Sequence, residues 1–168
     1  MDTRLAVASK RDWRSYADRP VPDDVRERIL DAGRLAGSAV NKQPWTFVVI
    51  ESDDAKEKAA GVVYAGDNIS TCAFAVAIAT PECGFPVDVG RAMQNMFLAA
   101  WNDGVVSCPN GVADPEAAAK ELGLDGLVPV NIPSFGYPKR DLHPESKSPE
   151  EWSAEANRKP LSEVVRTL

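Results

Sequence analysis

The longest helix that the sequence predicts, residues 88–104 (DVGRAMQNMFLAAWNDG), constrains the fold most. Apolar side chains recur along it at helical spacing and form a broad face, so we expect this helix to contact more than one layer of the structure. The apolar run CAFAVAIAT, residues 72–80, predicts a buried strand. Together these two segments indicate a chain that packs helices against a sheet.

The other predicted elements mix helices and strands without a regular alternation. Helices are expected at residues 21–37, 54–63 and 115–124, and strands at 46–51, 105–112 and 127–138, with the strand at 46–51 buried. Prolines place 127–138 at a sheet edge or make it irregular. Residues 139–159 are polar and are expected to run over a surface, before an extended or helical tail. This pattern predicts one α+β domain over residues 1–168.

Composition narrows the class of protein. The chain has 168 residues, 44% apolar and 26% charged, which is ordinary for a globular domain with a real core. A formal net charge of −6 argues against a nucleic acid or an anionic membrane as partner. No stretch has the length of a membrane helix and the first residues do not resemble a signal peptide, so we expect a cytoplasmic protein.

No motif supplies an acid–base or nucleophilic centre. The sequence has no G-x-G-x-x-G, no phosphate loop and no nucleophile elbow. Cys72, Cys83 and Cys108 with the one histidine, His143, predict neither a disulfide framework nor a metal site, and the thiols are interpreted as small core or loop side chains. If the chain is an enzyme, a bound cofactor supplies the reactive atom.

Three stretches, in this order, resemble the flavin-dependent nitroreductases. KRDWRSYADRPVP (10–22) is similar to that family's R-R-S-x-R-x-[FY], AGSAVNKQPWTFVVI (36–50) to A-P-S-x-x-N-x-Q-P-W-x-F-V-V-V, and NRKPLSEVV (157–165) to R-K-P-L-E-E-V-V, with FGYP upstream of that ending. The resemblance spans residues 10–166. It implies a nitroreductase-like fold, with a central, mainly antiparallel sheet flanked by helices, in a homodimer with an extended C-terminal tail.

The resemblance also implies a site for flavin mononucleotide (FMN) at the subunit interface, contacted by both chains. The phosphate needs several converging cations, which by resemblance come from the opening cluster and from Arg158 in the tail. Asn41 is expected to orient its loop or to contact the cofactor from the partner subunit. The residues implied to bind the cofactor are Lys10, Arg11, Asp12, Arg14, Ser38, Ala39, Asn41, Ser107, Cys108, Pro109, Asn110, Gly111, Arg158 and Lys159.

Residues 107–111 (SCPNG) are where we expect the contact to flavin N5, because the corresponding strand of the family packs on the flavin edge. The donor is either the hydroxyl of Ser107 or a backbone N–H of Asn110 or Gly111. The alternative is a strand that simply ends in a turn. The other clusters have ordinary explanations too: a solvated charge run at residues 10–14, surface cations at 158–159, and a helix stop with a turn at 37–41.

The implied reaction is of the ping-pong kind. NAD(P)H reduces the flavin, and the flavin then reduces a nitroaromatic, a quinone or a similar small-molecule acceptor. Asp12 stands where the family motif has serine, which leaves open another flavin chemistry: reductive dehalogenation or oxygen-dependent flavin cleavage. The stretch between Ile50 and Cys72 is shorter than in many family members, which leaves open a non-catalytic FMN-binding or carrier protein.

Overall fold

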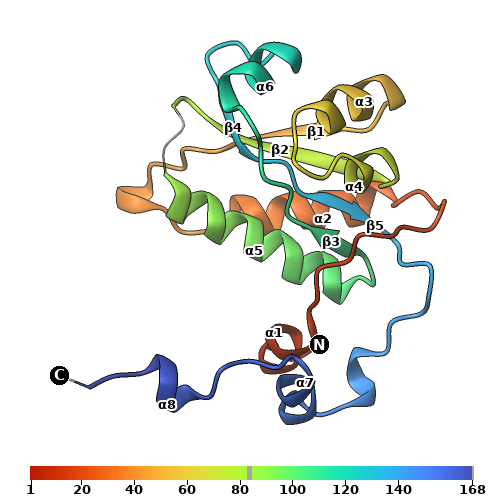
Figure 1. Cartoon of the computed structure of the whole chain (residues 1–168), viewed down its shortest axis with the longest axis vertical. Helices are drawn as coiled ribbons and strands as arrows, with labels where there is room; N and C mark the ends of the chain where they lie inside the picture. The colour runs from red at the N-terminus through yellow and green to blue at the C-terminus, as the bar shows by residue number, and fades with distance from the viewer. Residues whose placement is uncertain (83–84, 168) are drawn as a thin grey trace.

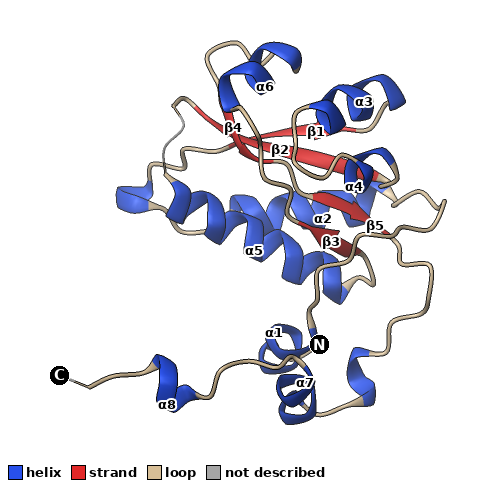
Figure 2. Cartoon of the chain, in the orientation of Figure 1, coloured by secondary structure: helices blue, strands red, loops and turns tan. Residues whose placement is uncertain are grey.

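A five-stranded sheet forms the centre of the computed structural model, which describes residues 1–82 and 85–167 (Figure 1). The strands are β1 (Thr46–Ile50), β2 (Phe74–Thr80), β3 (Val106–Cys108), β4 (Val128–Asn131) and β5 (Ser134–Gly136). The order is β1-β2-β5-β3, and β4 pairs with a second part of β2. All four pairings are antiparallel, and helices flank the sheet (Figure 2), so the predicted α+β class is confirmed.

The two faces of β2 explain the two layers of helices. Phe74, Val76 and Ile78 pack in the core that contains α2 (Asp23–Arg34) and α5 (Pro86–Asn102). The alternate alanines of β2 pack in a second core with α3 (Asp53–Gly61) and α4 (Asp67–Ser70), while α6 (Pro115–Glu121) lies over β4. This alternation follows from the two-residue period of a strand. Every residue of β2 is buried, as predicted.

The helix α5 contacts both cores, as its broad apolar face predicts. Phe97 packs in the first core, whereas Trp101, one turn later, packs in the second. The indole N–H of Trp101 also donates to the hydroxyl of Ser9, 2.9 Å away, which ties α5 to the N-terminal helix α1 (Thr3–Ser9). No helix of the described residues is both long and apolar enough to cross a bilayer.

Two predicted strands are placed differently from the expectation. β1 was expected to be buried, but it is an edge strand: among the described strands it pairs with β2 alone, and Thr46 and Val49 are exposed. The segment 127–138 is irregular, which was one of the two expectations: it forms two strands, with a register shift where β4 pairs with β2. Its second strand, β5, lies inside the sheet, between β2 and β3, and not at an edge. Its neighbour Pro133 fits because proline lacks only a donor: its carbonyl accepts the N–H of Val76 at 2.9 Å.

The segment 139–159 is not only irregular surface chain. It contains a short 3₁₀ turn, η2 (Pro144–Ser146), and the helix α7 (Pro149–Glu155), which packs against α1 away from the sheet (Figure 1). A capping box of Ser148 and Glu151 starts α7. Beyond it, α8 (Leu161–Val164) and an extended end stand apart from the rest of the chain in Figure 1, and the extended C-terminal tail of a homodimer stays a prediction.

Candidate functional site

The segment that follows α1 crosses the end of β3. Asp12 forms a parallel bridge with Ser107, and the N–H of Trp13 donates to the carbonyl of Ser107 at 3.0 Å. Arg14 and Lys10 lie close enough to Cys108 to act on its thiol: burial raises the pKa of Cys108, and these two cations oppose the rise. Two segments predicted to contact one cofactor therefore meet in the structure.

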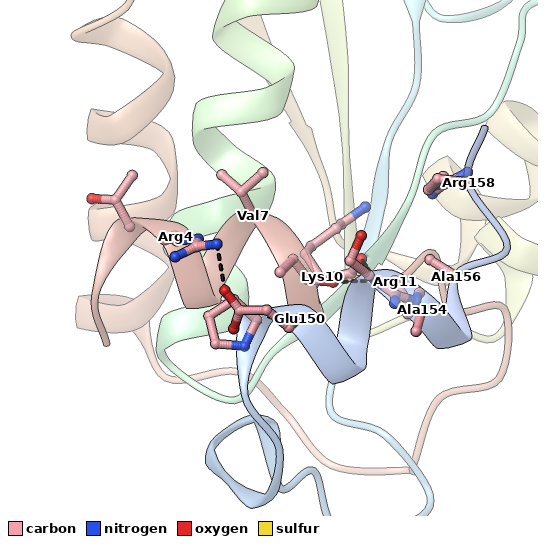
Figure 3. Close-up of a pocket in the computed structure, with 12 residues that line it drawn as sticks. Arg4, Val7, Lys10, Arg11, Glu150, Ala154, Ala156 and Arg158 are labelled. Atoms are coloured by element: carbon pink, nitrogen blue, oxygen red, sulfur yellow. Dashed lines mark hydrogen bonds and ion pairs between the residues drawn. The ribbon is translucent and has the colours of Figure 1, made fainter. Parts of the chain in front are cut away.

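A cavity of about 980 Å³ opens between α1 and α7 (Figure 3). Its lining includes four cationic side chains and one carboxylate: Arg4, Lys10, Arg11, Arg158 and Glu150. Because the whole chain carries a net charge of −6, this local excess of positive charge is of the opposite sign and favours an anion. Arg158 reaches the same cavity as Lys10, whereas Lys159, also predicted to bind the cofactor, is exposed and does not line it.

The cations of this cavity differ in what they already bind. The guanidinium of Arg11 donates to three carbonyl oxygens, those of Ala8 at 2.7 Å, Lys10 at 2.9 Å and Trp152 at 2.8 Å. It therefore holds α7 against α1 and is a positioning residue. The ammonium of Lys10 pairs with Asp12 and lies 4.2 Å from the centroid of the Phe97 ring. Arg4 pairs with Glu150, and Lys10 adds its charge from a nearly buried position. The exposed Arg158, which has no ion pair within the described residues, is therefore the side chain best suited to a phosphate.

Asn110 fixes the loop after β3. Its side-chain amide donates to the carbonyl of Ile132 at 2.8 Å and to the hydroxyl of Ser134 at 3.1 Å, and its oxygen accepts from the Asn68 amide at 2.8 Å. Its backbone N–H donates to the side-chain oxygen of Asn131 at 3.1 Å. A buried network in which each member is hydrogen-bonded holds a loop in one conformation. Asn68 was not among the predicted residues, and no sequence motif marks it.

The predicted hydrogen-bond donors to flavin N5 differ in how accessible they are to a ligand. The side-chain oxygen of Ser107 is buried and has no hydrogen-bond partner among the described residues, so it is closed to a ligand in this conformation. Gly111 is exposed, and its N–H donates to no group in the described part of the chain. The exposed ring of Tyr64 packs beside it, 3.1 Å from where a Cβ would stand. Gly111 thus offers an open donor.

The loop at residues 38–43 is strained and exposed. Val40, Asn41 and Gln43 all have positive φ, at 44°, 56° and 47°. A non-glycine residue in this region costs on the order of 1–3 kcal/mol, and such strain gathers at functional sites. The side chain of Val40 is 89% exposed, whereas hydrogen bonds hold the backbone of the loop, from the N–H of Asn41 to the carbonyl of Ser38 at 3.1 Å and from the N–H of Gln43 to the hydroxyl of Ser38 at 2.8 Å. The loop therefore has the features of a surface that meets a ligand or another chain.

This loop is anchored far from the cationic cavity. The N–H of Ala39 donates to the carboxylate of Asp88 at 3.3 Å, in the first turn of α5, whereas Lys10 lies over Phe97. These two positions are nine residues apart in α5, about 14 Å at 1.5 Å per residue. The structure joins residues 10–14 to β3 at Ser107 and places Arg158 in the cavity that Lys10 and Arg11 line, but it leaves Ser38, Ala39 and Asn41 outside that group.

The remaining titratable side chains offer no metal site. Within residues 1–82 and 85–167, no group of three or more His, Cys, Asp or Glu side chains is arranged to hold a metal ion. Cys72 and Cys108 are buried free thiols, as predicted, and Cys83 lies outside the described residues. Burial raises the pKa of Cys72 to about 11, so this thiol stays protonated near neutral pH. His143 is exposed, in agreement with its interpretation as a loop residue.

Known proteins match this chain over most of its length. The model of the nitroreductase family matches residues 7–78 and 79–137. A relative from Methanothermobacter thermautotrophicus, named as a candidate NADH dehydrogenase/NAD(P)H nitroreductase, is 30% identical over 149 residues, which are 82% of this chain and 78% of the relative. The crystal structure of a nitroreductase family protein from Clostridium difficile 630 has a TM-score of 0.82 and 27% identity, with all of both chains covered.

A third match shows the fold alone. An FMN-dependent nitroreductase from Clostridium difficile R20291 superposes with a TM-score of 0.73 and 21% identity over 82% of this chain and 88% of that one. Together with the antiparallel sheet and the two layers of helices, these matches define the class of protein, an oxidoreductase of this fold. The chain belongs to the nitroreductase family.

Proposed function

We propose that the protein is an FMN-dependent oxidoreductase that takes electrons from NAD(P)H and passes them to a nitroaromatic, a quinone or a similar small acceptor by a ping-pong mechanism. The observation that carries the proposal is that the cationic cavity lined by Lys10 and Arg158 is joined, through the bridge between Asp12 and Ser107, to the end of β3. When bound, FMN supplies the atom that accepts and donates hydride. The protein supplies binding, orientation and charge.

The residues fit this cofactor in three ways. Lys10 and Arg158 present cations to the phosphate monoester. Arg14 lies beside Cys108, where a cation favours negative charge on the flavin ring. The N–H of Gly111, in a loop that Asn110 fixes, would be available to donate a hydrogen bond to the ring edge of the flavin. Asp12, which replaces the serine of the family motif, pairs with Lys10, and this pairing reduces its repulsion of the phosphate.

The protein acts as a homodimer in this proposal. One chain holds Ser38, Ala39 and Asn41 about 14 Å along α5 from Lys10, so these residues serve the flavin of the partner subunit. The exposed Val40 and Val87, near the start of α5, would be covered in such an assembly. Light scattering on the purified protein tests this: a mass of one chain at micromolar concentration would contradict it.

The cofactor is tested by the absorption spectrum and a thermal melt. We expect a yellow preparation whose melting temperature rises with added FMN, because a ligand that binds only the folded state stabilises it by mass action. Riboflavin, which lacks the phosphate, should raise the melting temperature less. A colourless protein whose melting temperature stays the same at saturating FMN would overturn the proposal.

Turnover separates the alternatives. The FMN-loaded protein is incubated in air with NADPH and a quinone or nitroaromatic acceptor, and NADPH oxidation is followed. Steady oxidation that depends on the acceptor supports the proposed reaction. Fragmentation of the flavin, or release of halide from a halogenated phenol, points to the other flavin chemistries. Bound FMN without any turnover points to a carrier.

A further inference from the structure

The first turns of α5 hold the loop 38–43 from one side (Figure 1). Asp88 and Arg91 are three residues apart, so their side chains leave the helix on the same face. The carboxylate of Asp88 accepts the N–H of Ala39 at 3.3 Å, and the guanidinium of Arg91 lies beside Gly37. Two neighbouring points of the chain are therefore attached to one helix.

Gly37 leaves the space that the guanidinium of Arg91 occupies. A Cβ added at residue 37 would stand 2.5 Å from Nη2 of Arg91 and 3.2 Å from its Cζ, and the first distance is closer than real side chains approach. The φ of Gly37 lies outside the left-handed region, so the backbone conformation does not require glycine here. The lack of a side chain at residue 37 thus serves the contact with Arg91.

Asp88 is an anchor that is itself fixed in the fold. It is 6% exposed and lies in the first turn of α5, where the helix dipole favours a carboxylate. Within the described residues, no ion pair engages Asp88 or Arg91. Because a buried carboxylate needs hydrogen-bond donors, the bond from Ala39 stabilises Asp88 and at the same time fastens the loop to α5.

The family motif has a proline at the position of Gly37, since its A-P-S stands against AGS in this chain. Proline fixes its own φ and so restrains the chain in front of the loop. Glycine adds conformational freedom instead, directly before a loop in which three residues have positive φ. Another restraint has to hold this loop, and Arg91 and Asp88 supply one from α5.

We infer that Asp88 and Arg91 are positioning residues that take the place of this proline: they hold the loop 38–43 in the conformation that contacts the flavin of the partner subunit. The inference rests on the proposed function, in which Ser38, Ala39 and Asn41 serve that flavin. A loop that is already held loses less conformational entropy when FMN binds, so both side chains raise the affinity for FMN without touching it.

Hydrogen exchange of the flavin-free protein tests the hold on the loop, and fluorescence titration with FMN tests its consequence. In Arg91→Ala and Asp88→Ala, the amides of residues 38–43 should exchange faster than in the wild type, and the dissociation constant for FMN should rise about three- to tenfold. Asp88→Asn keeps an oxygen acceptor for Ala39, so its dissociation constant should stay within about twofold of the wild type. Gln94→Ala, exposed on α5 one turn beyond Arg91, is the control and should behave like the wild type.

A proline at residue 37 separates positioning from a general loss of stability. The N–H of Gly37 donates to no group in the described part of the chain, so Gly37→Pro removes no hydrogen bond there. In the double variant Gly37→Pro/Arg91→Ala, the guanidinium no longer occupies the space beside residue 37. The dissociation constant for FMN should therefore return to within about twofold of the wild type, although the contact with Arg91 is lost.

Unchanged exchange of residues 38–43 in both alanine variants, or unchanged affinity for FMN, would overturn the inference. So would a double variant that binds FMN no better than Arg91→Ala. A wild type that binds no FMN would contradict the proposed function instead, and faster exchange of residues 38–43 in both alanine variants would then still support the hold of α5 on the loop.

Discussion

The proposed site has two parts that are built differently. The part around β3, residues 10–14 with 107–111, is held by backbone pairing and by the buried Asn110 network. The loop 38–43, in contrast, is exposed and carries three non-glycine residues with positive φ. One chain thus builds the part around β3 by itself. The loop 38–43 has a strained backbone and is exposed in the described part of the chain. In the proposed homodimer, the loop 38–43 is the part to which the second subunit would contribute.

Asn110→Ala should have the largest effect on stability, because it removes the side-chain hydrogen bonds that fix the part around β3. The substitution leaves the Asn68 amide, the Ile132 carbonyl and the Ser134 hydroxyl with fewer partners in a buried place. We expect the free energy of unfolding to fall by about 2–4 kcal/mol, measured by urea unfolding. Asn102→Ala, on the exposed end of α5, is the control and should change it by less than about 0.5 kcal/mol. A loss below about 1 kcal/mol in Asn110→Ala would mean that the loop is not fixed by this network.

The sequence predicts the sheet and the main helices because their apolar periodicity is strong. The position of β1 at an edge could not be predicted, since an apolar run of five residues is the same whether one or two strands pair with it. α1 and α7, with seven residues each, are too short for a periodic signal. The capping box at Ser148 and Glu151 did mark the start of α7, and a search for that motif would have found it.

The candidate site was predictable only as a set of motifs. The motifs name residues 10–14, 38–41 and 158, but sequence order does not show that α5 separates the second group from the others. The accessibility of the two candidate hydrogen-bond donors could not be predicted either. The sequence places Ser107 and Gly111 in the same short segment, and only tertiary packing buries Ser107 and exposes Gly111. Distances across the fold and burial depend on packing between distant segments, which local patterns do not record.

Arg158→Ala should weaken FMN binding by about 1.5–3 kcal/mol if it makes one charge-assisted hydrogen bond to the phosphate. Its neighbour Lys159 provides a matched control, since it carries the same charge but does not line the cavity, and Lys159→Ala should change the affinity little. Fluorescence titration of the flavin-free protein measures both. Equal losses in the two variants would show that only the general charge of the tail matters, and an unaffected Arg158→Ala would remove the tail from the phosphate site.

The variant Gln43→Gly tests whether the backbone of the loop 38–43 is strained. Glycine adopts a φ of 47° without steric cost, which stabilises the folded state, but it also raises the entropy of the unfolded chain. We therefore expect a net rise in the free energy of unfolding of about 0.5–1 kcal/mol. Gln94→Gly, at an exposed position of the helix α5, is the matched control and should lower it by about 1 kcal/mol. The same sign in both variants would mean that the loop is not strained at this residue.

Ser107→Ala should have the smallest effect, and it decides between the two donors to flavin N5. Its buried hydroxyl has no partner among the described residues, so removing it should keep the free energy of unfolding and the FMN affinity within about 1 kcal/mol of the wild type. Ser134→Ala is the matched control: this serine is equally buried, but its hydroxyl bonds to Tyr16 at 2.7 Å and accepts from Asn110, so its loss should cost about 1–3 kcal/mol. A larger loss of FMN affinity in Ser107→Ala, or an altered flavin spectrum during stepwise reduction, would show that the hydroxyl turns toward the flavin when FMN binds. In that case the part around β3 also rearranges, and Gly111 is not the donor.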